Sequence, residues 1–164
     1  MKLYHGSIDL VRSPKILKSE NYLDFGPGFY TTSSYKQAER WARIKMRRSK
    51  SSTGYVSVYD LDLETAEKDC VLVRFDQADE IWLRFVTDHR RGTAPDTDCD
   101  LHIGPVADDN VYRTIRLFET GVYDVEETVK RLKTEVLHDQ WVFHTSKALS
   151  HLSFHEAKRI HKEA

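Results

Sequence analysis

One stretch near the start of the chain, residues 24–32 (Asp-Phe-Gly-Pro-Gly-Phe-Tyr-Thr-Thr), places the strongest constraint on the fold. Two glycines around a proline predict a tight turn with an exposed backbone. The aromatic pair and the threonines after it favour a strand. Ser33 and Ser34 are good N-caps, so a helix is expected from Tyr35 to about Lys50. The pattern fits a packed strand–helix corner. It equally fits a cradle that presents a flat ring and backbone amides to a planar, phosphate-bearing ligand.

The remaining sequence alternates between strand and helix patterns. Strands are expected at 2–5, 55–61, 70–75, 100–103, 140–145 and 152–154. Helical segments are expected at 13–18 (a single turn), 76–89, 108–119, 125–135 and 146–149. The order is not strictly βαβ, and no Gly-x-Gly-x-x-Gly follows the first strand, which argues against a doubly wound dinucleotide fold. The sequence therefore predicts an α+β fold with one domain over 1–164, whose charged tail at 155–164 frays.

Apolar residues in the middle of the chain carry expectations about burial. The run at 71–73 (Val-Leu-Val) predicts a strand buried on more than one side. The inward face of the helix at 76–89 is expected to carry Ile81, Trp82, Phe85 and Val86. With 164 residues, of which 40% are hydrophobic, the chain is long enough to close such a core.

The charges nearly balance, with a formal net charge of −1, so no global field draws the chain to nucleic acid or to an anionic membrane. Their distribution is uneven, because residues 36–50 carry seven basic side chains against the single acid Glu39. This basic segment is either a solvated helix face or a contact for NAD phosphates, nucleic acid or an acidic target. The acidic run at 96–109 lacks the spacing of a calcium loop, and His151 and His155 have no third ligand, so no metal site is expected.

The two cysteines, Cys70 and Cys99, have no metal-binding spacing and are expected to be free thiols in a reducing compartment. The N-terminus lacks the apolar core of a signal peptide, and no apolar run approaches membrane length. These features predict a cytoplasmic protein that does not interact with membranes.

Three motifs occur in a fixed order: His5-Gly6-Ser7 at the end of the first strand, residues 25–30 (Phe-Gly-Pro-Gly-Phe-Tyr), and Gln140 at the start of a late strand. Trp41 follows Tyr30 by eleven residues. This arrangement resembles the His–Tyr–Glu branch of the ADP-ribosyltransferase superfamily, the branch of diphtheria toxin and the poly-ADP-ribose polymerases. It also resembles an uncharacterised bacterial domain family of unknown function. The resemblance implies an ADP-ribosyltransferase-like fold, with a split antiparallel or mixed β-sheet core flanked by helices.

The resemblance implies a role for each motif residue. His5 would hold a ribose hydroxyl of NAD, and the Gly6 backbone would pair with the nicotinamide amide, which needs close approach without a Cβ. Tyr30 and Trp41 would form the two walls around the nicotinamide ring. Further NAD-binding positions would be Ser7, Gly28 and Ala38, the last standing where the family usually has a serine.

Gln140 departs from the family pattern, in which a glutamate holds the ribose 2′-hydroxyl and stabilises developing positive charge. Glutamine can keep the hydrogen bond, but it brings no negative charge and cannot act as a base. The loss of such an electrostatic contribution costs ~10²–10³ in rate unless another group replaces it. The candidates for such a compensating acid are Asp139, Asp100, Asp108 and Asp109, and the sequence leaves open whether any of them has this role.

The resemblance therefore predicts a catalytic set of His5, Tyr30 and Gln140 in an NAD-dependent mono-ADP-ribosyltransferase. The acceptor would be a protein, a nucleic acid or a small molecule, and the enzyme would be a bacterial toxin with a neutralising antitoxin partner. Two alternatives stay open: a non-catalytic module that binds NAD or ADP-ribose, and an NAD glycohydrolase. Taken singly, each motif residue also has a purely structural interpretation as a core histidine, a core aromatic or a strand-edge amide.

Overall fold

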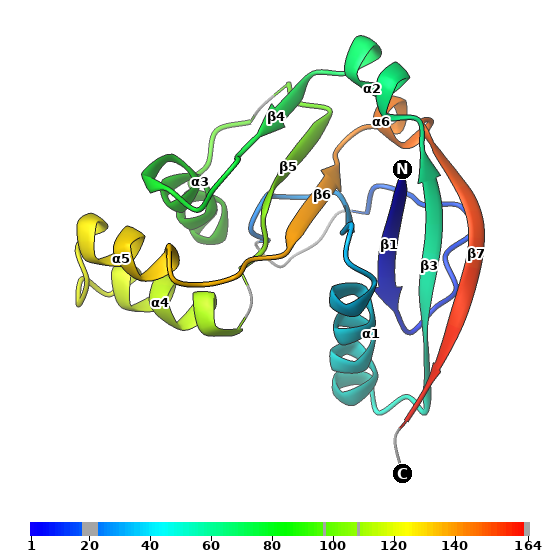
Figure 1. The fold of residues 1–164 in the computed structure, drawn as a ribbon, viewed down its shortest axis with the longest axis horizontal. Helices are drawn as coiled ribbons and strands as arrows, with labels where there is room; N and C mark the ends of the chain where they lie inside the picture. Colours follow the sequence, from blue (N-terminus) through cyan, green and yellow to red (C-terminus); the bar gives the residue numbers. More distant parts are fainter. Residues whose placement is uncertain (18–22, 97, 108, 163–164) are drawn as a thin grey trace.

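A computed structural model describes residues 1–17, 23–96, 98–107 and 109–162. These residues form a mixed α+β fold with two β-sheets and six helices, as the sequence predicts (Figure 1). The sheets meet at an angle, with α1 outside the first sheet and α3, α4 and α5 outside the second (Figure 1). The two amphipathic layers bury their apolar faces against each other and against these helices.

The first sheet is antiparallel, in the order β1 (Lys2–Ser7), β3 (Thr53–Leu61) and β7 (Leu152–His161). The second has the order β2 (Phe29–Thr31), β6 (Asp139–Phe143), β5 (Leu101–Pro105) and β4 (Leu72–Arg74). Only the β4–β5 pair in this sheet is parallel. The two sheets are joined at one point, where Tyr4 and Thr32 exchange backbone hydrogen bonds of 2.9 and 3.0 Å.

The helix after β2, α1 (Tyr35–Ser49), begins at Ser34, whose hydroxyl accepts from the Gln37 N–H at 3.3 Å. It packs on β1 and β3 through Ala38, Ala42 and Met46. The helices on the second sheet are α3 (Glu80–Arg91), α4 (Asp109–Glu119) and α5 (Val125–Leu132). Two short helices, α2 (Leu63–Asp69) and α6 (Ser146–Leu149), lie together near one end of the sheets (Figure 1).

Buried side chains follow the alternation of the strands. Between the sheets, the inward residues of both layers form one cluster, which includes Leu3, Phe29, Tyr59, Trp141 and Phe143. On the opposite face of the second sheet, Val142 and Phe25 pack under α3, α4 and α5. Alternation on β6 therefore turns Val142, and with it Gln140, away from the first sheet.

Several expected elements differ from the structure. The helical turn expected at 13–18 is absent over 13–17, and residue 18 lies outside the described residues. α2 was not predicted, although Asp62 caps it by accepting from the Thr65 N–H at 3.2 Å. The strand expected at 70–75 is only Leu72–Arg74 and lies at a sheet edge, so Val71 is 55% exposed. Ile81 faces solvent at 70% exposure.

The tail is the largest correction. Residues 155–161 were expected to fray, but β7 continues to His161 and pairs with β3 down to Thr53. Charged side chains on its outer face hid the strand, because only Ile160 supplies a fully buried apolar contact there. Ile160 packs against α1 with Met46 and Val56.

Replacing Ile160 by alanine tests whether this tail is part of the folded core. The change removes a buried side chain that α1 and β3 enclose, so we expect the free energy of unfolding to fall by about 2–5 kcal/mol. Urea denaturation followed by circular dichroism measures the loss. Arg159→Ala, an exposed neighbour on the same strand, is the matched control and should change stability little. Equal stability of the two variants would mean that the tail frays after all.

Candidate functional site

The candidate site lies where the two sheets separate. Tyr4 and Thr32 form a hydrogen-bonded pair, so the next pair of an unbroken antiparallel ladder would be Gly6 with Tyr30. That pair does not form. The Tyr30 carbonyl instead lies 2.6 Å from Nδ1 of His5, and the Gly6 carbonyl accepts from Nζ of Lys45 at 2.8 Å. Two side chains thus replace the backbone bonds at the split.

The geometry fixes the tautomer of His5. A carbonyl oxygen can only accept, so Nδ1 carries the proton and donates to Tyr30, and Nε2 is left as an acceptor. Burial, with the nearby Lys45 ammonium, lowers the pKa of His5 to about 4, which keeps the ring neutral near pH 7. The ring stacks on Phe29 with centroids 4.5 Å apart. His5 therefore lies on the inter-sheet side of the split.

Gly6 and α1 are in direct backbone contact. A Cβ on Gly6 would collide with the carbonyl oxygen of Ala38 and lie 2.8 Å from the Ala42 nitrogen. Only glycine allows α1 to lie this close, and Ala38 is fully buried by the contact. Ala38 was expected to edge the binding pocket; the structure corrects this, because its side chain has no exposed surface.

A cavity of about 200 Å³ lies along α1 beside this contact. Its lining residues are Gln37, Arg40, Trp41, Ile44, Lys45, Arg48 and Ala107. Three cations and a half-buried indole therefore surround a space bounded on its far side by Ala107, just after β5. The combination suits an aromatic ring attached to an anionic group. Trp41 therefore lines a cavity, whereas Tyr30, expected as the opposite wall, is not among its described lining residues, so the two expected walls stay a prediction.

The side chain of Tyr30 is held by the turn that precedes its strand. Its hydroxyl donates to the Gly26 carbonyl at 2.6 Å and accepts from the Phe25 N–H at 3.1 Å. Burial raises the pKa of Tyr30 above its ordinary value, so the phenol does not ionise near neutral pH. The tight turn predicted at 24–28 thus anchors the Tyr30 ring, which packs beside Val142 against the helices of the second sheet.

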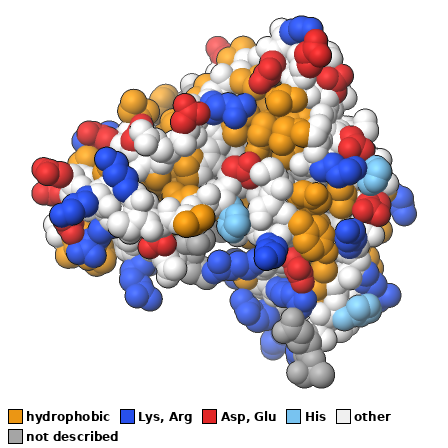
Figure 2. Space-filling model, viewed as in Figure 1, with side chains coloured by type: hydrophobic (Ala, Val, Ile, Leu, Met, Phe, Trp, Pro, Cys, Tyr) orange, Lys and Arg blue, Asp and Glu red, His pale blue; other side chains and the backbone are white. Residues whose placement is uncertain are grey.

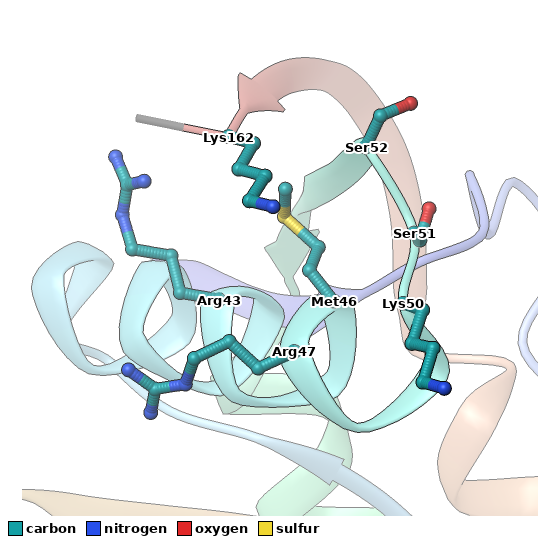
Figure 3. Close-up of a pocket in the computed structure, with 7 residues that line it drawn as sticks. All are labelled: Arg43, Met46, Arg47, Lys50, Ser51, Ser52 and Lys162. Atoms are coloured by element: carbon teal, nitrogen blue, oxygen red, sulfur yellow. The ribbon is translucent and has the colours of Figure 1, made fainter. Parts of the chain in front are cut away.

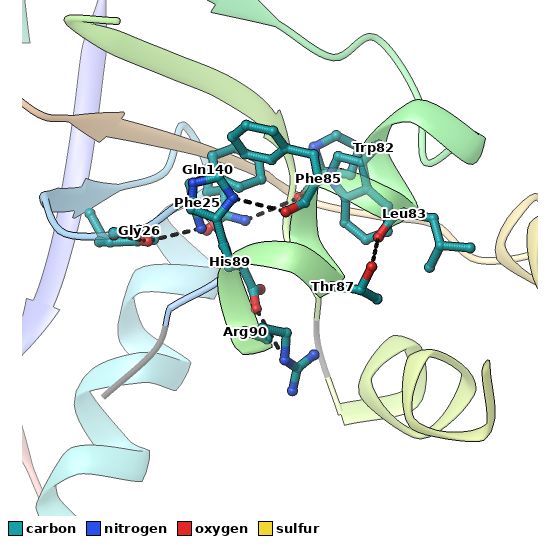
Figure 4. Close-up of polar contacts among 12 residues, drawn as sticks. Phe25, Gly26, Trp82, Leu83, Phe85, Thr87, His89, Arg90 and Gln140 are labelled. Carbon is teal, nitrogen blue, oxygen red and sulfur yellow. Dashed lines mark hydrogen bonds and ion pairs between the residues drawn. The ribbon is translucent and has the colours of Figure 1, made fainter. Parts of the chain in front are cut away.

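Gln140 lies in a buried polar cluster that the sequence did not predict. It is 2% exposed, and its Nε2 donates to the Pro105 carbonyl at 3.1 Å. Asp24 and Arg90 complete the cluster, with Nε of Arg90 3.7 Å from Oδ1 of Asp24. Figure 4 shows Gln140 beside Phe25 and near Gly26, with Arg90 extending away on the far side of His89. Nη1 of Arg90 is buried and has no hydrogen-bond partner among the described residues.

Asp24 stands between Gln140 and the cavity. Burial raises the pKa of Asp24, while Arg90 and hydrogen bonds from the Ala107 amide and the Gln140 side chain oppose that shift. Ala107 also lines the cavity beside Trp41. Asp24 therefore places a carboxylate beside the glutamine that stands in the glutamate position. Its signal in the sequence was its place at the head of the turn at 24–32.

Two of the acids named as candidates to compensate for Gln140, Asp139 and Asp100, are engaged elsewhere. Asp139 accepts from Ser33 and Trp141 at 2.6–2.9 Å, and although burial raises its pKa, these bonds outweigh burial and lower it. Asp100 binds Lys147 and Thr145 at 2.8 and 2.7 Å near α6. Asp108 lies outside the described residues, and only the backbone of residue 109 is described. Asp24, rather than Asp139 or Asp100, is the acid that is hydrogen-bonded to the Gln140 side chain.

Two further residues expected in the site, Gly28 and Ser7, have local structural contacts of their own. Gly28 packs on β6, where a Cβ would lie 2.7 Å from Val142 and 2.8 Å from the Phe143 carbonyl. Ser7 ends β1, and its hydroxyl accepts from the Asp9 N–H at 3.4 Å. Their expected roles in NAD binding stay predictions. Among the motif residues, the structure therefore gathers Gly6, Trp41, Tyr30 and Gln140 around the split, with His5 filling it.

A pair of hydrogen-bonded histidines, His102 and His144, holds the turn at residues 24–28 against the second sheet. His144 donates from Nδ1 to the Pro27 carbonyl at 2.7 Å, so its Nε2 accepts from Nδ1 of His102 at 2.8 Å. Burial, with the neighbouring His144 and His89, lowers the pKa of His102 to about 3. His102 packs among Phe25, Phe75 and Phe85. This neutral pair fixes Pro27 against β5 and β6.

Comparison with known families identifies the chain. The sequence profile of the DUF3990 family, described as proteins of unknown function, matches residues 1–154. The chain belongs to the DUF3990 family. This confirms the expected domain family of unknown function, whereas kinship with ADP-ribosyltransferases stays a prediction. Comparison with curated proteins and with solved structures found no significant match.

Three general properties of this DUF3990 chain follow from the described residues. None of its described helices is long and apolar enough to cross a membrane. Within the same residues, no group of three histidine, cysteine or acidic side chains is arranged to hold a metal ion. Cys70 and Cys99 are both free thiols.

The neutral histidines predict a loss of stability in acid. The unfolded chain protonates a histidine near pH 6.5, whereas folded His102 resists protonation down to about pH 3. Between these values the unfolded state binds the extra proton, so the free energy of unfolding falls with pH by about 1.4 kcal/mol per unit for each such histidine. Denaturation series between about pH 7 and pH 5 measure this slope.

His102→Gln keeps a donor for His144 but cannot titrate, so its slope should be shallower than that of the unchanged protein. The exposed His161→Gln is the control and should keep the original slope. A His102→Gln slope equal to that of the control would contradict the assignment of His102 as a buried neutral group.

Proposed function

We propose that this DUF3990 chain is an NAD-dependent mono-ADP-ribosyltransferase that uses NAD as its substrate. The observation that supports it most is the interrupted ladder between Gly6 and Tyr30, with Trp41 lining a cavity beside it. The backbone groups left at the edge of Gly6 suit a planar carboxamide, which needs one donor and one acceptor. The cations along the cavity suit the pyrophosphate of a dinucleotide.

The reaction breaks the bond between nicotinamide nitrogen and C1′ of the ribose. Nicotinamide leaves with the bonding electron pair, an oxocarbenium-like centre forms at C1′, and an acceptor atom bonds to that carbon while its proton passes to solvent. The protein contributes positioning and charge stabilisation in such a reaction. In this proposal Gly6 and Trp41 orient the nicotinamide, and Nε2 of neutral His5 accepts a hydrogen bond from a ribose hydroxyl.

Lys45 has to leave the Gly6 carbonyl for NAD to bind. The cavity of about 200 Å³ is smaller than the 300–1,000 Å³ that holds a drug-sized ligand, and the Lys45 side chain fills the space at the glycine. Burial lowers the pKa of Lys45, which reduces the cost of displacing it. The released ammonium would then face the phosphates of NAD.

In this proposal Asp24, whose ionisation is opposed by burial and favoured by Arg90, supplies the negative charge that Gln140 lacks. Its carboxylate is beside the Gln140 amide, and burial makes a charge there act with less screening than on the surface. In this proposal Gln140 holds the ribose hydroxyl while Asp24 stabilises the developing positive charge. The pair divides between two residues the work of one glutamate.

The test of the proposed function is nicotinamide release from NAD by the purified protein. His5→Asn keeps a donor for the Tyr30 carbonyl but lacks the acceptor at Nε2, so we expect release to fall ~10²-fold or more without loss of folding. His161→Asn is the control and should keep full activity. Release by neither the unchanged protein nor any variant, with no NAD-induced rise in melting temperature, would overturn the proposal.

The division of labour between Asp24 and Gln140 has its own test. Asp24→Asn should lower kcat by ~10²–10³ with little change in KM, because the charge acts in the transition state. Adding Gln140→Glu to that variant returns a carboxylate to the site and should restore much of the activity. Activity of Asp24→Asn equal to that of the unchanged protein would contradict the role given to Asp24.

A non-catalytic binding module is the second candidate. It is favoured by the Gln140 amide, which is already bonded to Pro105, and by the Lys45 ammonium on Gly6. NAD would then raise the melting temperature without releasing nicotinamide. Transfer and simple hydrolysis, as by an NAD glycohydrolase, differ in whether ADP-ribose ends up attached or free. The expected toxin role, the antitoxin partner and the cytoplasmic location stay predictions.

A further inference from the structure

The exposed side of α1 carries one straight row of cations. Its members are Lys36, Arg40, Arg43, Arg47 and Lys50. They recur at intervals of four, three, four and three residues, so they lie along one side of the helix. The Cβ atoms of neighbouring side chains in such a row are about 6 Å apart. We call this row the basic ridge, and Figure 2 shows Lys and Arg side chains gathered over this part of the molecule.

One ridge member, Arg43, is itself paired with the single acid of α1, so the positive character of the ridge rests on the exposed Lys36, Arg47 and Lys50. Glu39 accepts from Nε and Nη2 of Arg43 at 3.1 and 2.7 Å, which leaves no second acid on α1. The chain as a whole has a net charge of −1, so the ridge is a local concentration and not a reflection of composition. A row of cations at this spacing matches successive phosphates of a nucleic-acid strand.

A hollow lies on each side of the ridge. On one side is the candidate NAD cavity, which Arg40 lines together with Trp41. On the other is a cavity of about 610 Å³, lined by Arg43, Arg47, Lys50 and Lys162 around Met46. Figure 3 shows Lys162 reaching back from beyond β7 towards Met46, while Arg43 and Arg47 extend from successive turns of α1. Among the residues that the structure describes, four cations and no acid line this second cavity.

The shape favours a single strand over a duplex. α1 is packed along β1 and β3 and does not project from the surface, so it cannot enter a major groove as a recognition helix does. The hollows beside it can instead receive unstacked bases. Trp41 is placed in one of them, and bases stack on such aromatic side chains in proteins that bind single strands.

We propose that the basic ridge binds single-stranded nucleic acid and that this strand is the acceptor of ADP-ribose. The acceptor part rests on the proposed function, because the ridge leads from the second cavity to the cavity at Trp41. A hydroxyl or ring nitrogen of the strand would form the new bond to C1′ as nicotinamide leaves, and its proton would pass to solvent. The binding part stands on the ridge alone.

The binding test uses fluorescence anisotropy with a labelled single-stranded RNA of about 15 nucleotides. The triple variant Lys36→Gln, Arg47→Gln, Lys50→Gln removes three ridge cations. The control is Arg113→Gln, Lys130→Gln, Lys133→Gln, which removes the same charge from exposed positions of α4 and around the end of α5. We expect the ridge variant to bind at least about tenfold more weakly and its salt slope to fall by about 2, with the control unchanged.

Other polyanions separate the alternatives. Equal losses in the ridge and control variants would reduce the effect to general charge and overturn the proposal. Tighter binding of poly-glutamate than of RNA would point to an acidic protein, and equal binding of a duplex of the same sequence would contradict recognition of a single strand. Anionic lipid vesicles that compete with RNA at equal phosphate concentration would point to a membrane surface instead.

The acceptor test follows the label from radioactive NAD into the RNA. We expect the ridge variant to lose incorporation into RNA while its release of nicotinamide without acceptor is unchanged. Release without incorporation by the unchanged protein would contradict the acceptor and leave the proposed function intact. RNA binding without any release would contradict the proposed function and leave the binding part intact.

Discussion

The structure depends on an interruption in one antiparallel ladder. Tyr4 and Thr32 pair as neighbouring strands do, but the next pair is broken, and His5 and Lys45 take the carbonyls that it would have used. Buried backbone groups need partners, so two strands can separate here only because side chains satisfy them. The break turns one continuous layer into two sheets that diverge around a shared core. It also leaves a strand edge facing α1, and this edge is the centre of the candidate site.

Glycine at position 6 allows α1 to lie directly against the strand edge at the break. The backbone of α1 lies against Gly6 so closely that any side chain would displace the helix. The resemblance expected a glycine there for contact with nicotinamide, and the structure adds a packing reason that operates without ligand. One residue therefore sets both the distance of the helix and the accessibility of the strand edge. Packing alone excludes a side chain at this position, and the nicotinamide contact stays a prediction.

Local patterns were enough to predict most of this fold. The turn at 24–28, the capped helix α1 and the alternating strand β3 follow from residue types that act over a few positions. The prediction for the tail was wrong because its pairing partner, β3, is about a hundred residues away in the sequence. The outward-facing charges of the tail also conceal its strand alternation. For Val71 the sequence predicted too much burial, because an apolar run does not reveal that its strand lies at the edge of a sheet.

The candidate site shows the same division. His5, Gly6, Tyr30 and Trp41 were predicted because each belongs to a local motif, and the structure places them around the split. Asp24 was missed because its importance comes from Gln140 and Arg90, which are distant in sequence. Under the proposed function, a carboxyl group on the turn beside β6 would supply the charge that the strand position lacks, and no local motif would show it. Gln140 alone would then be a poor guide to activity, since the proposed electrostatics belong to the pair of residues.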